Sequence, residues 1–243
     1  MEENETMIGL VTGASDGIGK ETARQLAAKG LKIIVGSRNL EKGEQVISDL
    51  RDSGVECDLV ALDITDPASV QAAARDLSER YGHLDLLVNN AGIALDRGPL
   101  HEMAYEDFVT TFQTNVFGTF LVTQAFLPLL RRSKRARIVN VSSSLASLID
   151  MNDSTSRYYN IALPAYAASK AAINVMTVHL ARELKADGIK VNAVEPGLTA
   201  TRYVSLPGAQ TVEVGAEASV IYSLIDDNGP TGGFFDRTGP HNW

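Results

Sequence analysis

Short apolar runs alternate with longer helix-type runs along this chain, and this alternation limits the folds open to it more than any other feature. The first apolar run, Ile8 to Thr12, leads directly into a helical pattern from Ile18 to Lys29. Continuous apolar strands separated by helices are typical of a parallel sheet that helices cover on both faces. The order therefore predicts an α/β Rossmann fold, a doubly wound parallel sheet of about seven strands.

The rest of the chain continues the same order. Asp66 followed by Pro67 is typical of a helix start, with the aspartate as cap and the proline in the first turn. The further strands are expected at Leu31 to Gly36, Val55 to Leu62, Leu84 to Val88, Arg137 to Val141, Ile189 to Val194 and Gly233 to Phe235. The further helices are expected at Leu40 to Asp52, Asp66 to Tyr81, about Tyr105 to Leu130 and Pro164 to Lys185.

Two polar stretches lack a regular pattern and follow directly after predicted strands. They are Ser144 to Leu163 and Leu198 to Gly215. An open α/β sheet binds its ligands at the carboxyl ends of its strands. We therefore expect these stretches to form a substrate pocket and its lid.

Length and composition favour one globular domain. The chain has 243 residues, of which 44% are hydrophobic and 21% charged, so residues 1–243 are expected to form a single NAD(P)-binding domain. A net charge of −8 argues against nucleic acid as a partner, because binding a polyanion requires positive charge. The basic residues between Arg131 and Arg137 are interpreted as a cation-rich helix end.

The chain shows no pattern for disulfides, metal binding or membrane insertion. Cys57 is the single cysteine, which excludes an intrachain disulfide. The segment Met1 to Thr6 is acidic and polar, unlike a signal peptide, and no apolar run reaches the ~18 residues that a membrane span needs. A cytoplasmic location without membrane contact is expected. The four histidines, His83, His101, His179 and His241, have no metal-ligand spacing and are assigned no role.

A glycine-rich loop joins the first strand to the first helix. It runs from Thr12 to Gly19. Glycines there permit a tight turn and a close approach of the backbone to a pyrophosphate, which the positive end of the following helix attracts. The residues expected to bind this part of a dinucleotide are Gly13, Ser15, Asp16, Gly17, Ile18 and Gly19.

The end of the second strand bears on the choice between NAD and NADP. An acidic residue at this position binds the ribose hydroxyl of NAD, and a basic one pairs with the extra phosphate of NADP. The chain has no acid between Gly36 and Asn39, and Arg38 can bind a phosphate with two hydrogen bonds. We therefore favour NADP. NAD remains the alternative, since the glycine loop carries Asp16 instead of a second cation.

Tyr166 and Lys170 lie four residues apart in a predicted helix and so share one face of it. A cation beside a phenol favours the phenolate and lowers the pKa of the tyrosine. Such a tyrosine can exchange a proton with a carbonyl compound or an alcohol.

Together, these motifs resemble the short-chain dehydrogenase/reductase family in its TGxxxGxG and YxxxK form. The resemblance extends from about Ile8 to Trp243. Its matching elements are Thr12 to Gly19, Asp63 with Ile64, Asn89 to Gly92, Asn115, Ser143, Tyr166 with Lys170, and Pro196 with Gly197 followed by Thr201.

The resemblance implies a role for each catalytic position. Tyr166 would protonate the substrate oxygen during reduction, and Lys170 would lower the pKa of Tyr166 and bind the nicotinamide ribose. Ser143 would hydrogen-bond the substrate oxygen, although Ser142 and Ser144 are neighbouring candidates. Asn115 would hold a water that links Lys170 to solvent; judged from the residues alone, a local hydrogen bond in the helix is the simpler interpretation.

The resemblance also implies further cofactor contacts. Asp63 and Ile64 would meet the adenine, and the loop from Pro196 to Thr201 would close over the nicotinamide amide. The positions concerned are Asp63, Ile64, Asn89, Ala91, Gly92, Pro196, Gly197, Thr199 and Thr201, besides Tyr166 and Lys170.

The spacing between Ser143 and Tyr166, 23 positions, is longer than the family's common gap and resembles the carbonyl-reductase branch. An insertion before the tyrosine can obstruct the helix interface through which many relatives form tetramers, so dimer, tetramer and monomer all stay open.

The residues and the resemblance together predict an NADPH-dependent carbonyl reductase or alcohol dehydrogenase that acts reversibly on a small ketone, aldehyde or alcohol. One alternative is an NAD-linked alcohol or sugar dehydrogenase. Another is a non-catalytic nucleotide-sensing protein on the same fold. A nucleotide-sugar epimerase fits less well, because the glycine spacing is wider and the part after Thr201 is short.

Overall fold

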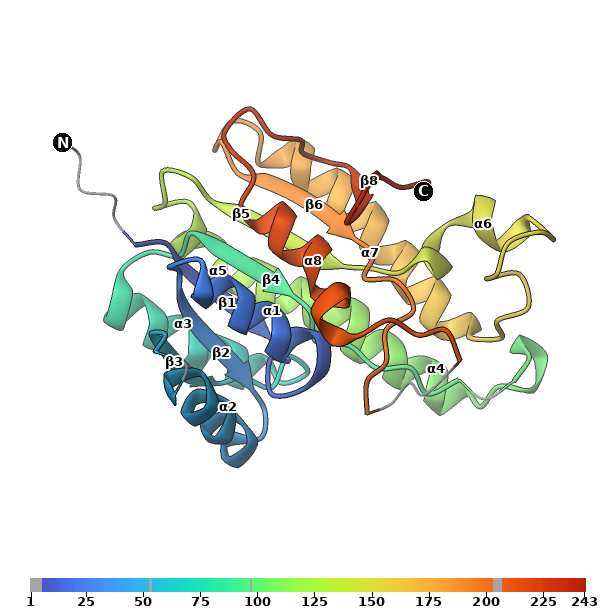
Figure 1. Cartoon of the computed structure of the whole chain (residues 1–243), viewed down its shortest axis with the longest axis horizontal. Helices are drawn as coiled ribbons and strands as arrows, with labels where there is room; N and C mark the ends of the chain where they lie inside the picture. The colour runs from blue at the N-terminus through green and yellow to red at the C-terminus, as the bar shows by residue number, and fades with distance from the viewer. Residues whose placement is uncertain (1–5, 53, 97, 203–206) are drawn as a thin grey trace.

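The fold is an α/β sandwich built on one central sheet, seen in a computed structural model that describes residues 6–52, 54–96, 98–202 and 207–243. These residues form eight strands in the order β3-β2-β1-β4-β5-β6-β7-β8 (Figure 1). All neighbouring strands pair in parallel except β7 and β8. This order confirms the predicted doubly wound fold. The antiparallel β8 is an addition that the sequence analysis did not predict.

Every predicted strand is present, with ends that shift by at most two residues. β1 and β5 are buried along their whole length. β1 accordingly consists of apolar or small residues, whereas the buried Arg137 and Asn140 of β5 are held by side-chain hydrogen bonds. The strands are β1 Ile8–Thr12, β2 Lys32–Ser37, β3 Cys57–Ala61, β4 Leu86–Asn89, β5 Arg137–Val141, β6 Lys190–Val194, β7 Phe234–Asp236 and β8 Gly239–Pro240.

The predicted helices are present as well, and their ends follow local rules. Asp66 caps α3, where its side chain accepts a hydrogen bond of 2.9 Å from the Ala68 N–H, and Gly82 ends the helix at φ 77°. The α-helices are α1 Gly17–Ala28, α2 Leu40–Asp52, α3 Pro67–Tyr81, α4 Tyr105–Phe112, α5 Thr119–Leu130, α6 Leu148–Asn152, α7 Pro164–Glu183 and α8 Val212–Ser223.

Three details differ from the expectation. The long helix from Tyr105 to Leu130 is interrupted by a π-helical turn, η2 Gln113–Gly118. The stretch expected to be irregular after β5 holds a 3₁₀ turn, η3 Ser144–Ala146, and the short helix α6. The last residues of the expected lid belong to α8, because Gly215 and Ala216 are buried where α8 packs against α1. Residues 203–206 of that lid, and residues 1–5, lie outside the described residues.

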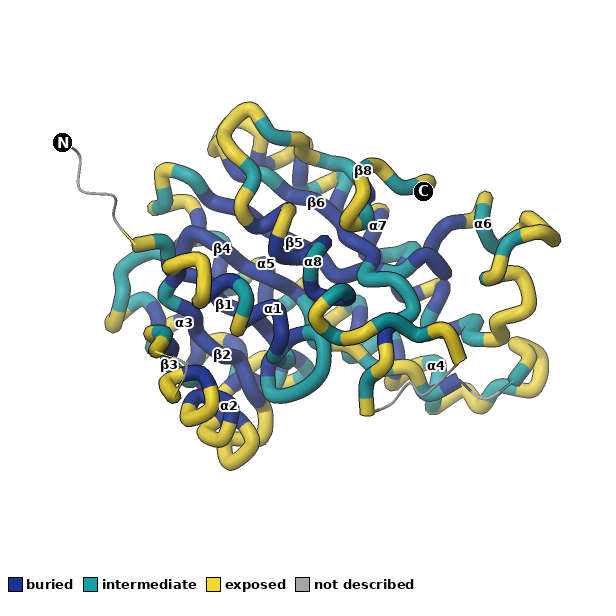
Figure 2. The backbone as a smooth tube through the Cα atoms, viewed as in Figure 1, coloured by how far each residue is buried: buried dark blue, intermediate teal, exposed yellow. Residues whose placement is uncertain are grey.

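Two hydrophobic cores cover the two faces of the sheet. One core packs α3, α5 and α7 against the sheet through residues such as Val70, Phe126 and Ala181. The other packs α1, α2 and α8 through residues such as Leu26 and Ile47. Figure 2 shows the strands buried in the middle, with the exposed backbone on the outer turns of the helices and in the loops. None of the helices in the described part of the chain is long and apolar enough to cross a membrane.

The end of the chain returns to the carboxyl edge of the sheet. After β8, the ring of Trp243 stacks on that of Phe234, with 5.6 Å between their centroids. The Ser147 hydroxyl donates a hydrogen bond of 3.1 Å to the Trp243 carbonyl. The tail therefore lies against the segment that leads from β5 into α6.

Candidate active site

The carboxyl ends of β1, β4, β5 and β6 bring the predicted site segments to one edge of the sheet. β1 is followed by the glycine loop, β4 by Asn90 to Gly92, β5 by Ser142 to Ser144 and β6 by Pro196 to Thr201. The chain leaves β1 toward β2 on one side and later returns to β4 on the other, which makes this the switch point where open α/β sheets bind ligands.

The glycine loop has a shape that side chains would prevent. Gly13 adopts φ 63°, and a Cβ atom there would lie 2.9 Å from the Ala91 Cα atom. Asp16 caps α1, since its carboxylate accepts a 2.8 Å hydrogen bond from the Gly17 N–H. Asn90, which belongs to the matching element Asn89 to Gly92 but was given no role of its own, donates to the Thr12 carbonyl over 2.9 Å and so ties the loop to β4.

A cavity of about 370 Å³ opens in front of the N-terminus of α1. Its lining includes Asp16 and Gly17 from the loop and Thr201 and Arg202 from the segment after β6. The Arg202 guanidinium lies 3.3 Å from the Asp16 carboxylate, so the two segments meet across the cavity. A helix N-terminus with an arginine beside it fits the pyrophosphate of a dinucleotide.

Arg38 and Asp63 lie near each other at the ends of β2 and β3. Burial raises the pKa of the Asp63 carboxyl, but hydrogen bonds from Thr65 and the nearby charge of Arg38 lower it by more, so the pKa lies below its usual value. The Arg38 side chain is exposed, so a phosphate could bind to its guanidinium. Ile64 is buried, and a Cβ atom on Gly118 of the π-turn would lie 2.8 Å from its Cδ1 atom. The residues at this end fit an adenosine that carries a phosphate.

Asp96 fixes the start of α7 and was not found from the sequence. Its buried carboxylate accepts hydrogen bonds from the Ala165 N–H (2.7 Å) and the Tyr166 N–H (3.1 Å). These are the N–H groups that a helix leaves unpaired in its first turn. Asp96 stands 69 positions before Ala165, so no local pattern could indicate this cap.

Tyr166, Lys170 and Ser143 come together as predicted. The Ser143 side chain lies beside the Tyr166 phenol, close enough to lower the pKa of the phenol. Lys170 is 5% exposed, and its Nζ atom lies 5.6 Å from the centre of the Tyr166 ring. The same Nζ atom donates a 2.7 Å hydrogen bond to the Val141 carbonyl at the end of β5.

The pKa values of this pair differ from the expectation. Burial raises the pKa of Tyr166 to about 12; the Ser143 hydrogen bond lowers it in part, and the charge of Glu195 raises it further. Burial also lowers the pKa of Lys170 to about 8. Burial therefore outweighs any lowering of the Tyr166 pKa by Lys170 in this structure, where the Lys170 amine bonds the Val141 carbonyl, and the expected effect of Lys170 stays a prediction.

Asn115 joins the loop after β4 to the catalytic helix. It is 1% exposed and lies in the π-turn, a kind of turn that is frequent at functional sites. Its side chain accepts from the Ile93 N–H over 2.8 Å and donates to the Ser169 hydroxyl over 2.9 Å. Ser169 in turn donates to the Tyr166 carbonyl over 2.7 Å. The water relay expected at Asn115 stays a prediction.

Asn89 and the loop after β6 complete the predicted set. The Asn89 side chain is buried and donates to Asn140 and Thr123, so it supports the sheet. The loop after β6 lies over the glycine loop, because a Cβ atom on Gly17 would lie 3.5 Å from the Thr201 methyl group. Other predicted positions lie close by. The Ala91 N–H donates to Thr12, a Cβ atom on Gly92 would lie 3.4 Å from the Lys170 Nζ atom, and Thr199 donates to the Pro196 and Gly197 carbonyls.

Comparisons with known proteins agree with this arrangement. A family model described as short chain dehydrogenase matches residues 8–209. A short-chain dehydrogenase of Penicillium roqueforti is 38% identical over 217 residues, which cover 87% of this chain and 86% of that protein.

Solved structures with the same fold include two complexes with NADPH. The NADPH-bound carbonyl reductase from chicken fatty liver has a TM-score of 0.87 and 26% identity, and the match covers 99% of this chain and 96% of that one. An actinorhodin polyketide ketoreductase with NADPH has a TM-score of 0.83 and 29% identity, with 97% of both chains covered.

Proposed function

Because this chain belongs to the short-chain dehydrogenase family and is therefore an NAD(P)-dependent oxidoreductase, we propose that it is an NADPH-dependent carbonyl reductase, which interconverts a ketone or aldehyde and its alcohol. The observation that carries the proposal is the Ser143 side chain beside the Tyr166 phenol, with the buried Lys170 amine next to the same ring. A proton donor next to a second hydrogen-bonding group suits an oxygen atom that gains negative charge.

Each residue of this group has a distinct task in the proposed reaction. A Tyr166 pKa of about 12 keeps the phenol protonated near neutral pH, so it can donate a proton to the substrate oxygen. Ser143 orients that oxygen, and Lys170 holds a positive charge close to the phenolate that forms when Tyr166 gives up its proton. Asp96 and Asn115 keep the first turn of α7 in place. The nicotinamide, when bound, supplies the hydride for reduction and accepts it in the reverse direction.

The preference for NADPH over NADH depends on Arg38. Its guanidinium is exposed at the end of β2 beside Asp63, where a phosphate on the adenosine ribose would lie. In Arg38→Ala, we expect the Kd of NADPH to rise at least about tenfold and the Kd of NADH to stay the same, because charge-assisted hydrogen bonds contribute ~1.5 to 3 kcal/mol. Fluorescence titration with both cofactors measures this. An equal loss for the two would contradict the preference.

The proposed activity is tested by the oxidation of NADPH with a panel of aromatic ketones, aldehydes, α-ketoesters and diketones. Tyr166→Phe should lower turnover by about 10²- to 10⁴-fold, the usual contribution of a positioned acid. Tyr105→Phe is the matched control, since Tyr105 is 76% exposed at the start of α4 and lies outside the stretches expected to form the substrate pocket. Turnover that survives in Tyr166→Phe would contradict the mechanism. Tight NADPH binding without turnover on any compound would favour a nucleotide sensor.

A further inference from the structure

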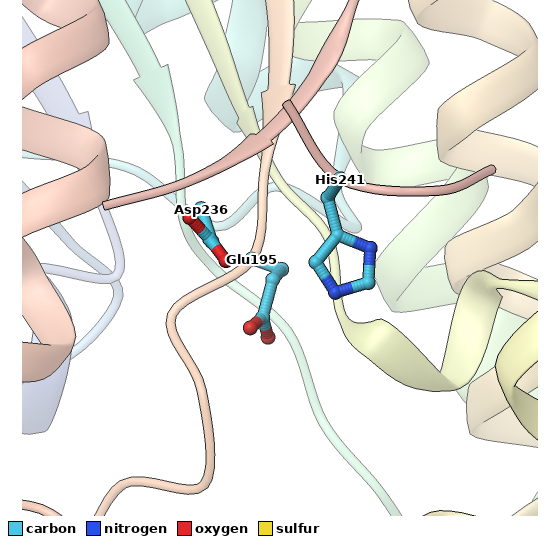
Figure 3. A group of neighbouring side chains, drawn as sticks. All are labelled: Glu195, Asp236 and His241. Carbon is cyan, nitrogen blue, oxygen red and sulfur yellow. The ribbon is translucent and has the colours of Figure 1, made fainter. Parts of the chain in front are cut away.

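We propose that Glu195, Asp236 and His241 bind a divalent transition-metal cation beside the active site. One ligand atom from each residue lies within 4.8 Å of the other two. Glu195 directly follows β6, Asp236 ends β7 and His241 follows β8, and Figure 3 shows the three side chains next to one another at these strand ends. The proposal concerns metal binding alone and does not depend on the proposed reaction.

The antiparallel β8 is what brings His241 to this place. The chain reverses after Asp236, and the His241 N–H then donates a 2.8 Å hydrogen bond to the Phe234 carbonyl. The imidazole also lies against the Phe234 ring, with 4.9 Å between ring centroids. Backbone and ring are both held, so His241 is positioned before any ligand arrives.

The hydrogen bonds of His241 place the lone pair of the neutral ring on Nε2. Its Nδ1 atom lies 3.0 Å from the Asn242 carbonyl, which can only accept, so Nδ1 carries the hydrogen. In the neutral ring, Nε2 then has the lone pair and accepts a 3.3 Å hydrogen bond from the Ser144 hydroxyl, which a metal at Nε2 would displace. The Asp150 carboxylate lies 3.7 Å from the same nitrogen. Histidines that bind metals commonly donate their other N–H to a backbone carbonyl in this way.

In the described part of the chain, hydrogen bonds hold only one oxygen of each carboxylate. Glu195 is 8% exposed, and one of its oxygens accepts a 2.9 Å hydrogen bond from the Gly197 N–H. One oxygen of Asp236 accepts from Thr238 and Gly239. Among the described residues, the second oxygen of each carboxylate has no hydrogen bond, and neither residue forms an ion pair with lysine or arginine. Two carboxylates this close repel each other, and a dication between them would remove that repulsion.

The donor set indicates the class of metal. One imidazole and two carboxylates suit Zn²⁺, Co²⁺ or Mn²⁺, whereas Mg²⁺ and Ca²⁺ prefer oxygen ligands alone. Three protein ligands leave at least one coordination position open. Glu195 and Asp236 also line a cavity of about 250 Å³ together with Gln210. Water or a substrate oxygen could reach a metal from there, so the site is of the open kind.

Binding of Co²⁺ to the full chain, without a polyhistidine tag, tests the proposal. We expect one equivalent of Co²⁺ to produce visible absorption bands, and one equivalent of Zn²⁺ to displace it. In Asp236→Asn and His241→Gln, the affinity for Co²⁺ should fall at least about tenfold, since each change removes a ligand. Glu195→Gln should do the same while it keeps an acceptor for the Gly197 N–H.

His179→Gln is the matched control, because His179 is an exposed histidine of α7. It should bind Co²⁺ like the wild type. Circular dichroism and thermal unfolding without metal establish that each variant is folded. The proposal is overturned if the wild type binds no Co²⁺, if the three ligand variants bind it as well as the wild type, or if His179→Gln loses it too.

Discussion

The glycine loop and the catalytic pair lie at the same edge of the sheet, but the chain builds them in different ways. The loop is contained in one strand–turn–helix unit, where Asp16 caps the helix that begins at the next residue. Tyr166 and Lys170 instead depend on Asp96 and Val141, which belong to other elements. A local site is therefore damaged by changes within it, whereas a distributed site can be damaged from far away in the sequence.

The largest loss of stability and of NADPH binding is expected from a substitution inside the glycine loop. Gly13→Ala forces alanine into φ 63° and places its Cβ atom 2.9 Å from the Ala91 Cα atom. Strain and overpacking together should lower the free energy of unfolding by about 3 kcal/mol and weaken NADPH binding about 100-fold. Urea unfolding and fluorescence titration measure these losses.

Gly30→Ala is the control for the strain alone. Gly30 has φ 90°, and a Cβ atom there would meet no other atom within 4 Å. This variant should lose only about 1 to 2 kcal/mol and bind NADPH normally. If both glycine variants bind NADPH equally well, the close approach of the loop to Ala91 does not matter for the cofactor.

A somewhat smaller loss of stability and turnover is expected when Asp96, the distant cap of α7, is replaced. Asp96→Ala leaves the N–H groups of Ala165 and Tyr166 unpaired in a buried place, which should cost about 2 to 3 kcal/mol of stability and lower kcat about tenfold. Asp66→Ala removes an exposed cap from α3, so it should cost about 1 kcal/mol and leave kcat unchanged. Equal kcat values for the two variants would show that Tyr166 does not need its cap.

The buried Lys170 should make stability rise with pH. The pKa of Lys170 is about 8 in the folded protein and about 10.5 in the unfolded chain, so the unfolded chain binds more protons in this range. Integration gives a gain of about 2 kcal/mol in the free energy of unfolding from pH 7 to about pH 9.5. Above about pH 10, the raised pKa of Tyr166 acts in the opposite direction, because the unfolded chain then loses its phenol proton first.

Chemical unfolding at several pH values checks this, with two lysine variants for comparison. Lys170→Met should abolish the rise, whereas Lys42→Met removes an exposed amine and should keep it. If the free energy of unfolding of Lys170→Met rises with pH as much as that of the wild type, groups other than Lys170 cause the rise.

The smallest effect is expected at Ser169, which links Asn115 to the Tyr166 carbonyl. Ser169→Ala leaves one buried N–H of Asn115 without this acceptor and should cost about 1 kcal/mol, with less than about a twofold change in kcat. Thermal unfolding and initial rates measure both. A change in kcat as large as that of Asp96→Ala would mean that the Asn115 link, and not the cap, sets the position of the helix.

The sequence predicted features that depend on local contacts and missed features that depend on contacts between distant residues. Asp66 and Asp96 both cap helices, but only Asp66 stands next to its helix, so only that cap was predicted. The π-turn around Asn115 was missed because its geometry depends on packing of Gly118 against Ile64, far away in the sequence. β8 was missed because it is two residues long and depends on pairing with β7.

The properties of the candidate site also divide into those that the sequence could indicate and those that depend on distant contacts. The spacing of four residues indicated that Tyr166 and Lys170 share a helix face, and the family resemblance implied that Ser143 lies with them. The pKa of Tyr166 could not be predicted, because it depends on how deeply the phenol is buried and on the distant Glu195. His241 was assigned no role, since its neighbours Glu195 and Asp236 come from other strands.

The path of the chain after β8 decides where a fusion partner should be attached. Because Trp243 stacks on Phe234 and its carbonyl accepts a hydrogen bond from Ser147, any polypeptide added beyond Trp243 would begin beside the segment that follows Ser143. A histidine-rich affinity tag placed there would also compete with the proposed metal site for its cation. A fusion that ends before Met7 enters at the amino end of β1, at the opposite edge of the sheet, and leaves the site open.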